Sequence, residues 1–215
     1  MCYNEKNGEG FPSPIRIIGE EKNRSSHERS HPMENCESSY RRFLAGDEAA
    51  FDEILDACKD SLIFFLCRYV KSVAIAEEIA ADTFALLIVK PDRYDFSVSL
   101  KTWLFTVGRN RALDYLRRQN LRRILPLEEA IELPGSDEDD PEALFLQKER
   151  DIALHRAMDR LKPEYQTALH LVYFENLSYE ETGRVLKKSR KQIENLVYRG
   201  KNALRADSQL KELMK

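Results

Sequence analysis

The spacing of apolar residues between positions 38 and 123 is the feature that most restricts the fold of this chain. One stripe repeats at i, i+3, i+4 and i+7, and it comprises Phe51, Ile54, Leu55, Cys58, Leu62, Phe65 and Leu66. This is the period of an amphipathic helix. Two more helices are predicted, one over 75–89 before Pro91 and one that begins at Leu100 after a capping Ser99.

Turn-forming residues are scarce, which argues against sheet-rich architectures. Only 8 glycines and 8 prolines occur in 215 residues, whereas average usage is about 7% and 5%. A sandwich or a barrel of short strands needs many such turns. We therefore predict an all-α fold.

No apolar run approaches the ~20 residues that a membrane-spanning helix needs. The longest, Leu62 to Leu66, has five residues, and the N-terminus lacks the apolar segment of a secretory signal. No CxxC spacing occurs among Cys2, Cys36, Cys58 and Cys67. We expect a cytoplasmic protein with reduced thiols, with no membrane insertion and no metal site or cofactor.

Composition divides the chain into four parts. Residues 1–36 are polar, contain prolines and lack periodicity, so they are predicted to be a disordered extension, and Met33 is an alternative translation start. Residues 37–123 form a first helical domain. Residues 124–142 form an acidic flexible linker, and 143–215 form a second helical domain.

Charge is strongly segregated although the net charge is only −3. The segment 101–123 has seven basic residues and one acid, and 184–205 has eight basic residues and one acid, whereas 128–142 has eight acids and no base. Two basic segments on either side of an acidic tether indicate two separate contacts with a polyanion. Solvated helix faces are the alternative that charge alone leaves open.

The second domain contains the signature of a helix-turn-helix. Ser178 with Glu181, and Ser189 with Gln192, have the spacing of capping boxes that start two consecutive helices. The second of these helices has an apolar side and a polar, basic side. A helix with such a polar side fits the major groove, where Lys and Arg contact phosphates and Asn or Gln read base edges.

Three segments, in order, resemble bacterial RNA polymerase sigma factors of the extracytoplasmic-function (ECF) group in the sigma-70 family. Residues 76–84 (AEEIAADTF) resemble the core-polymerase-binding segment of region 2, and 102–118 (TWLFTVGRNRALDYLRR) resemble its promoter-melting segment. Residues 161–201 resemble region 4. The resemblance covers most of the chain. The sequence departs from the family pattern at Lys187, where a glycine is common.

The resemblance implies an alternative sigma factor that binds core RNA polymerase, recognises the promoter −35 and −10 elements, and promotes melting. The implied partners are the β′ clamp helices and the β flap of the polymerase, and promoter DNA. An anti-sigma factor is a further candidate partner. The acidic linker is expected to thread the polymerase channels in place of nucleic acid.

Site residues follow from the matched motifs. Core polymerase is expected to contact an apolar anchor ringed by acids, formed by Glu77, Glu78, Ile79, Asp82 and Phe84. The −10 element is expected to contact a base-capturing loop over 92–99 and the helix after it, through Phe96, Arg109, Asn110, Arg117 and Arg118. The −35 element is expected to contact Arg190, Lys191, Gln192, Asn195, Tyr198 and Arg199.

Two alternatives and three minor expectations remain. A stand-alone helix-turn-helix regulator is the rival function, and three acids on the helix that contains Glu77 are a weak rival for metal binding. Trp103 is expected to pack in the core rather than to melt DNA. His155 and His170 are expected at the surface. No catalytic constellation appears, so we predict no enzymatic activity, and the promoter sequence, regulon and activating signal stay open.

Overall fold

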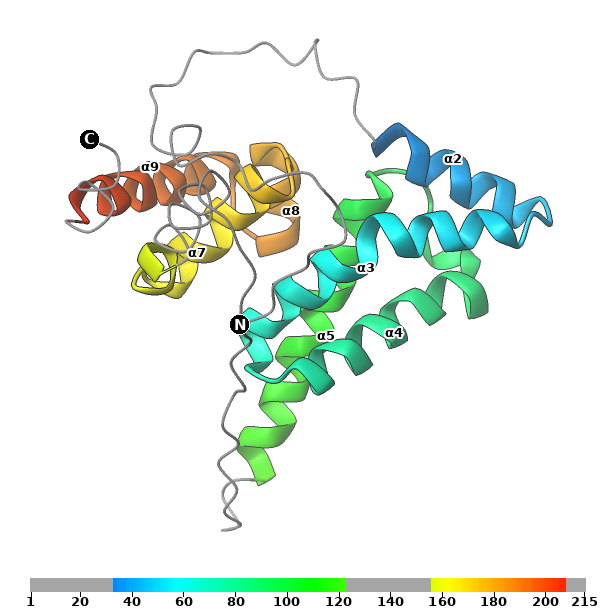
Figure 1. The fold of residues 1–215 in the computed structure, drawn as a ribbon, viewed down its shortest axis with the longest axis horizontal. Coiled ribbons are helices and arrows are strands. Elements are labelled where there is room, and N and C mark those ends of the chain that lie inside the picture. The colour runs from blue at the N-terminus through cyan, green and yellow to red at the C-terminus, as the bar shows by residue number, and fades with distance from the viewer. Residues whose placement is uncertain (1–32, 123–155, 208–215) are drawn as a thin grey trace, which may run out of the picture.

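A computed structural model describes residues 33–122 and 156–207 of the chain. Its N-terminal part consists of α2 (Met33–Leu44), α3 (Ala49–Val70), α4 (Val73–Val89), the 3₁₀ turn η1 (Pro91–Arg93) and α5 (Leu100–Arg122). Its C-terminal part consists of α7 (Pro163–Leu169), the π-helical turn η2 (His170–Phe174), α8 (Tyr179–Leu186) and α9 (Arg190–Ala206). The described residues contain no strand, which confirms the all-α prediction (Figure 1).

Local signals in the sequence explain where the N-terminal helices begin and end. Ser72 caps α4, since its side chain accepts a hydrogen bond from the amide of Ile75. Helix α4 ends at Val89, before Pro91. The Ser99 hydroxyl accepts from the amide of Thr102 at 3.3 Å, so it caps α5 as predicted.

The helix-turn-helix prediction is confirmed in detail. Both capping boxes are present, with Ser178 and Glu181 at the start of α8 and Ser189 and Gln192 at the start of α9. Lys187 ends α8 in the left-handed conformation, at φ 55. This is the position at which the family pattern favours glycine, because a Cβ is strained there.

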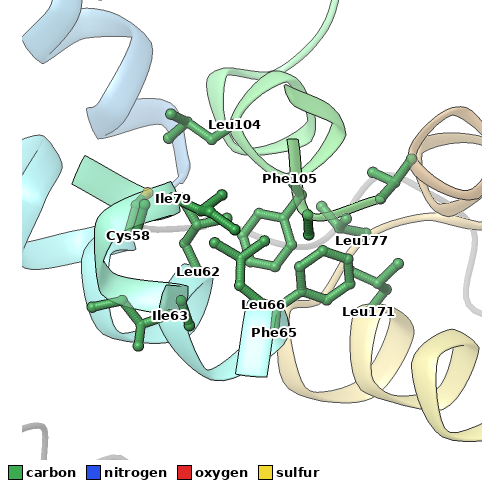
Figure 2. Close-up of a cluster of buried hydrophobic side chains, with 14 of the residues drawn as sticks. Cys58, Leu62, Ile63, Phe65, Leu66, Ile79, Leu104, Phe105, Leu171 and Leu177 are labelled. Carbon is green, nitrogen blue, oxygen red and sulfur yellow. The ribbon is translucent and has the colours of Figure 1, made fainter. Parts of the chain in front are cut away.

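The two helical domains share one continuous core, a contact that the sequence analysis did not predict. Phe65 of α3 and Phe105 of α5 are fully buried beside Leu171 and Leu177 of the C-terminal part (Figure 2). Helix α8 also packs along α5. The first turns of α5 therefore lie against the first helix of the helix-turn-helix.

The structure corrects two expectations and bears out a third in part. Helix α2 begins at Met33, so the last residues of the predicted disordered extension are helical. His170 is not at the surface but is 1% exposed. Trp103 packs against the core as expected, beside Tyr94, but it is only half-buried, and its indole donates a hydrogen bond to the Arg93 carbonyl.

Other expectations fall outside the described residues. These are most of the N-terminal extension, the acidic linker over 124–142, and His155. Within the described helices, none is long and apolar enough to cross a membrane.

Candidate functional site

The acidic face predicted on α4 is partly present. Glu77 and Glu78 are exposed and form no ion pair among the described residues. Asp82 is also exposed, but its carboxylate accepts a hydrogen bond from Arg111 of α5 at 2.6 Å. The first two acids are therefore free to meet a basic partner, whereas Asp82 is already engaged within the domain.

The residues of the predicted apolar anchor are largely buried, because Ile79 and Phe84 are only 8% and 4% exposed. Both point into the bundle and contribute to its core. The exposed apolar side chains of α4 are instead Ile88 and Val89, at 52% and 71%. Ile88 lies at the edge of a groove between α3 and α4 that is also lined by Phe51, Leu55, Lys59, Ile63, Glu77, Ala80, Ala81, Phe84 and Ala85.

The loop before α5 holds Phe96 in a constrained position. The residue has φ 59, a conformation that is uncommon outside glycine. Its ring packs against Tyr40 and Tyr94, with centroids 5.9 and 4.6 Å away. The Arg41 guanidinium lies over the ring, 4.0 Å from its centroid. Sequence reasoning missed Arg41, because no local pattern links it to a loop more than fifty residues later.

The predicted basic residues of α5 are spread along the helix rather than gathered. At 1.5 Å per residue, Arg118 lies about 27 Å along the axis from the start of the helix. Arg109 donates to the Tyr69 hydroxyl at 3.3 Å, and Arg117 pairs with Asp114 at 2.7 Å. Asn110 is half-buried, and Arg118 is exposed without an ion pair among the described residues.

Helix α9 presents an open polar face. Ile193, Val197 and Leu204 are buried against α7 and α8. The opposite side exposes Lys191, Asn195, Tyr198 and Arg199, and no hydrogen bond or ion pair of these side chains occurs within the described residues. A helix with this free polar face can enter a groove of DNA.

Two residues predicted to contact DNA are instead engaged within the domain. The Gln192 side-chain oxygen accepts from the Ser189 amide at 2.8 Å, as the second half of the capping box. The Arg190 guanidinium lies 2.7 Å from Glu180 and 3.0 Å from Glu194. Its charge is thus largely matched before any partner arrives.

Comparison with known proteins places both domains in one family. The model of "Sigma-70 region 2" matches residues 54–122, and that of "Sigma-70, region 4" matches residues 151–204. Over 137 residues the chain is 36% identical to the ECF RNA polymerase sigma factor RpoE of Cereibacter sphaeroides, with 63% of this chain and 73% of the relative covered. The chain belongs to the ECF group of the sigma-70 family.

Further similarities agree with this assignment. The ECF sigma factor SigW of Bacillus subtilis is 28% identical over 175 residues, which cover 78% of this chain and 92% of SigW. The fold resembles the sigma factor RpoE of Bartonella quintana, solved in complex with the anti-sigma factor NepR, with TM-score 0.54 and 21% identity over 76% of this chain and 96% of RpoE. The protein is an alternative sigma factor that directs transcription initiation, not a stand-alone regulator.

The two regions of this sigma factor meet at a buried polar cluster. Glu175, between η2 and α8, places one oxygen 2.7 Å from the Lys101 ammonium of α5 and the other 3.1 Å from Nε2 of His170. The side chains of Glu175 and His170 are only 5% and 2% exposed. Region 2 therefore supplies the cation, and region 4 the carboxylate, of a buried ion pair.

Burial and the attraction between these groups have opposite effects on the pKa of each residue in the cluster. Burial raises the pKa of Glu175, but the nearby Lys101 ammonium and the contact with His170 outweigh it and lower the pKa to about 2. Burial lowers the pKa of His170 to about 4, and Glu175 only partly offsets this. At neutral pH the carboxylate is charged and the imidazole is neutral.

A second polar contact joins the regions at the start of both α5 and α8. The Ser99 and Thr102 hydroxyls donate to one oxygen of Glu181, at 2.8 and 3.2 Å. The other oxygen accepts from the amide and hydroxyl of Ser178 in the capping box. Burial raises the pKa of Glu181, and these hydrogen bonds lower it further than burial raises it. One carboxylate thus caps α8 and bonds to the cap of α5.

Proposed function

We propose that three separate surfaces divide the work of this sigma factor. The acids of α4 and the groove between α3 and α4 bind core polymerase, the loop before α5 captures a −10 base, and the polar face of α9 reads the −35 element. The observation that carries this assignment is the free face of α9, because four adjacent polar side chains without partners in the described residues are available for DNA.

The core-binding surface combines charge with shape. Glu77 and Glu78 form no ion pair within the part of the chain that the structure describes, and Glu77 lines a groove together with the small side chains of Ala80, Ala81 and Ala85. Small residues allow a partner helix to approach closely, and Ile88 supplies exposed apolar area at the edge. A basic helix of the polymerase clamp suits this surface, because acids at the rim of an interface steer an oppositely charged partner. An anti-sigma factor would inhibit the protein by covering the same groove.

Charge reversal tests this surface. Replacing Glu77 and Glu78 with Lys leaves α4 folded, since both residues are exposed, and places like charge against the clamp. We expect at least a tenfold weaker affinity for core polymerase, measured by fluorescence anisotropy of labelled protein. Asp56→Lys is the matched control, because it reverses an exposed acid on α3 outside the groove lining. Equal affinities for the variant and the control would exclude this face from the polymerase interface.

The −10 surface is proposed to use the loop that holds Phe96. A flipped base needs a pocket and a stacking partner, and stacking on an aromatic ring is worth ~1–3 kcal/mol. Arg41 already occupies one face of the ring, so we assign it a part in stacking or phosphate contact. Asn110→Ala and Arg41→Ala should slow open-complex formation, read by permanganate reactivity, while closed-complex affinity changes little. Equal loss of closed and open complexes would contradict this division of labour.

The −35 surface has a phosphate anchor and a base reader. Arg199→Ala should weaken all promoters alike and reduce the salt slope of binding by roughly 0.9, the value for one lost phosphate contact. Asn195→Ala should change sequence preference at one position by ~1–3 kcal/mol with little change of the slope. Asn202→Ala on the same helix is the control. Selection from randomised −35 sequences tests both roles, and a shifted preference with Arg199→Ala alone would reverse them.

The whole proposal is tested by run-off transcription. Core polymerase with genomic promoter fragments should yield discrete transcripts only when this protein is added. Transcripts without the protein, or operator binding that polymerase does not affect, would refute the proposed use of these surfaces.

A further inference from the structure

Two cysteine thiols lie against each other in the core of region 2. Cys36 of α2 and Cys58 of α3 have their sulfur atoms 3.9 Å apart, in hydrogen-bonding contact. Cys36 is 7% exposed and Cys58 is 2% exposed. Neither forms a disulfide in the structure, and a third cysteine, Cys67, lies further along α3.

We propose that Cys36 and Cys58 are a modification site, at which hydrogen peroxide forms a reversible disulfide between α2 and α3. A disulfide bond is about 2.05 Å long, so the two sulfur atoms have to approach by about 2 Å. Helix α2 can supply this movement, because it is the first described helix; it packs mainly against α3 and less against α5, and its Tyr40 hydroxyl donates to the Leu87 carbonyl of α4.

The surroundings assign a role to each sulfur. Cys36 is the attacking thiol, because it is the more exposed of the two and the hydrogen bond from Cys58 lowers its pKa, with a smaller effect of Lys101 in the same direction. Cys58 is the resolving thiol, because the contact with Cys36 and deep burial raise its pKa. Burial of both sulfur atoms selects a small oxidant over a bulky one such as glutathione disulfide.

The reaction balances as a two-electron oxidation. The Cys36 thiolate attacks one peroxide oxygen, the O–O bond breaks, and the departing hydroxide takes up the thiol proton to give water and a sulfenic acid. The Cys58 sulfur then attacks the Cys36 sulfur, the S–O bond breaks, and hydroxide leaves with the Cys58 proton as a second water. Two thiols are oxidised to one disulfide while one peroxide is reduced to two waters.

The cross-link would restrain the loop that holds Phe96, because α2 supports this loop. Glu37 of α2 accepts a hydrogen bond from the amide of Leu100, at the end of the loop, at 2.6 Å. Tyr40 and Arg41 of α2 both pack on the Phe96 ring. Fixing α2 to α3 therefore also fixes three contacts to residues 96–100.

Peptide mapping of the full-length protein tests the chemistry directly. Trypsin places the four cysteines on separate peptides, 1–6, 30–41, 43–59 and 60–68. After mild hydrogen peroxide treatment and alkylation of the remaining thiols, we expect 30–41 joined to 43–59, with a mass 2 Da below the sum of the two thiol peptides. Dithiothreitol should separate them. The same protein treated with glutathione disulfide should show this link at a level at least tenfold lower.

Three single variants make the result specific. Cys36→Ser and Cys58→Ser should each abolish the link, whereas Cys67→Ser should retain it and serves as the matched control. A link that involves Cys2 or Cys67, oxidation of Cys36 only to the sulfinic or sulfonic acid, or full alkylation of both peptides after peroxide would each overturn the proposal.

Amide hydrogen exchange tests the structural effect. The oxidised protein should exchange several-fold more slowly than the reduced protein over residues 96–100, and the difference should vanish in Cys36→Ser. The melting temperature of the oxidised form should rise by about 5 °C or more, because the bond closes a loop between residues 36 and 58. Unchanged exchange in a protein that carries the disulfide would refute the link between α2 and the loop, but not the cross-link itself.

Discussion

Replacing Glu175 with Gln removes one charge of the buried ion pair between the two regions and keeps the size of the side chain. In the structure the carboxylate lies 2.7 Å from the Lys101 ammonium, whose side chain is only 16% exposed. Removing one partner of a buried ion pair typically costs about 3–5 kcal/mol, because the other charge stays buried without compensation. The partners come from different regions, so the protein can relieve this penalty by separating the regions and exposing Lys101 to water.

Small-angle X-ray scattering is the appropriate assay for this separation. We expect Glu175→Gln to increase the radius of gyration while far-ultraviolet circular dichroism stays unchanged. Glu164→Gln is the matched control, because Glu164 also pairs with a lysine in region 4, at 3.5 Å, but its side chain is 64% exposed. The double variant Lys101→Met/Glu175→Leu should restore the wild-type radius, since it removes both buried charges at once. Equal radii for wild type and Glu175→Gln would refute the reasoning.

Three further predictions concern stability. Lowering the pH from 6.5 to 4 should weaken the contact between the regions by up to about 3 kcal/mol. The pKa of His170 is lowered to about 4 when the regions are in contact, so in this pH range the separated state binds a proton more readily than the closed state. Scattering at each pH checks this. Lys187→Gly should raise the melting temperature and increase the free energy of unfolding by about 1 kcal/mol, because glycine adopts the positive φ at the end of α8 without strain. Gly183→Ala should destabilise region 4 by more than about 2 kcal/mol in thermal unfolding, since its Cβ would lie 2.6 Å from the backbone oxygen of Lys188.

Local physical signals explain which parts of the fold could be predicted. Helix period placed the stripe of α3, and the pairs Ser178–Glu181 and Ser189–Gln192 predicted the starts of α8 and α9, because capping depends on residues three positions apart. The exposed face of α9 followed from the same period. Each of these features is determined within a few turns of one helix.

Sequence patterns are less informative where distant residues decide the environment of a side chain. Ile79 and Phe84 were assigned to a binding face by their motif, but apolar side chains on a helix face the core unless a partner covers them. His170 could not be recognised as buried, because two of the rings that enclose it, Phe64 and Phe65, belong to the other region. Gln192 shows a third cause, since its side-chain oxygen is already engaged in the cap of α9.

The contact between the regions also sets a condition on initiation. The −10 and −35 elements are centred about 25 base pairs apart, which is on the order of 80 Å along B-DNA, whereas α5 and α8 touch in the structure (Figure 1). The regions must separate before both elements are read. The apparent affinity of the sigma factor for a promoter-bound polymerase therefore equals its intrinsic affinity multiplied by the fraction of molecules in which the regions are separated. While the closed form predominates, each 1.4 kcal/mol added to or removed from the Lys101–Glu175 contact then changes promoter occupancy about tenfold at limiting protein. Substitutions at this contact can thus tune the transcriptional output of every promoter that the factor serves, without changing a residue that faces polymerase or DNA.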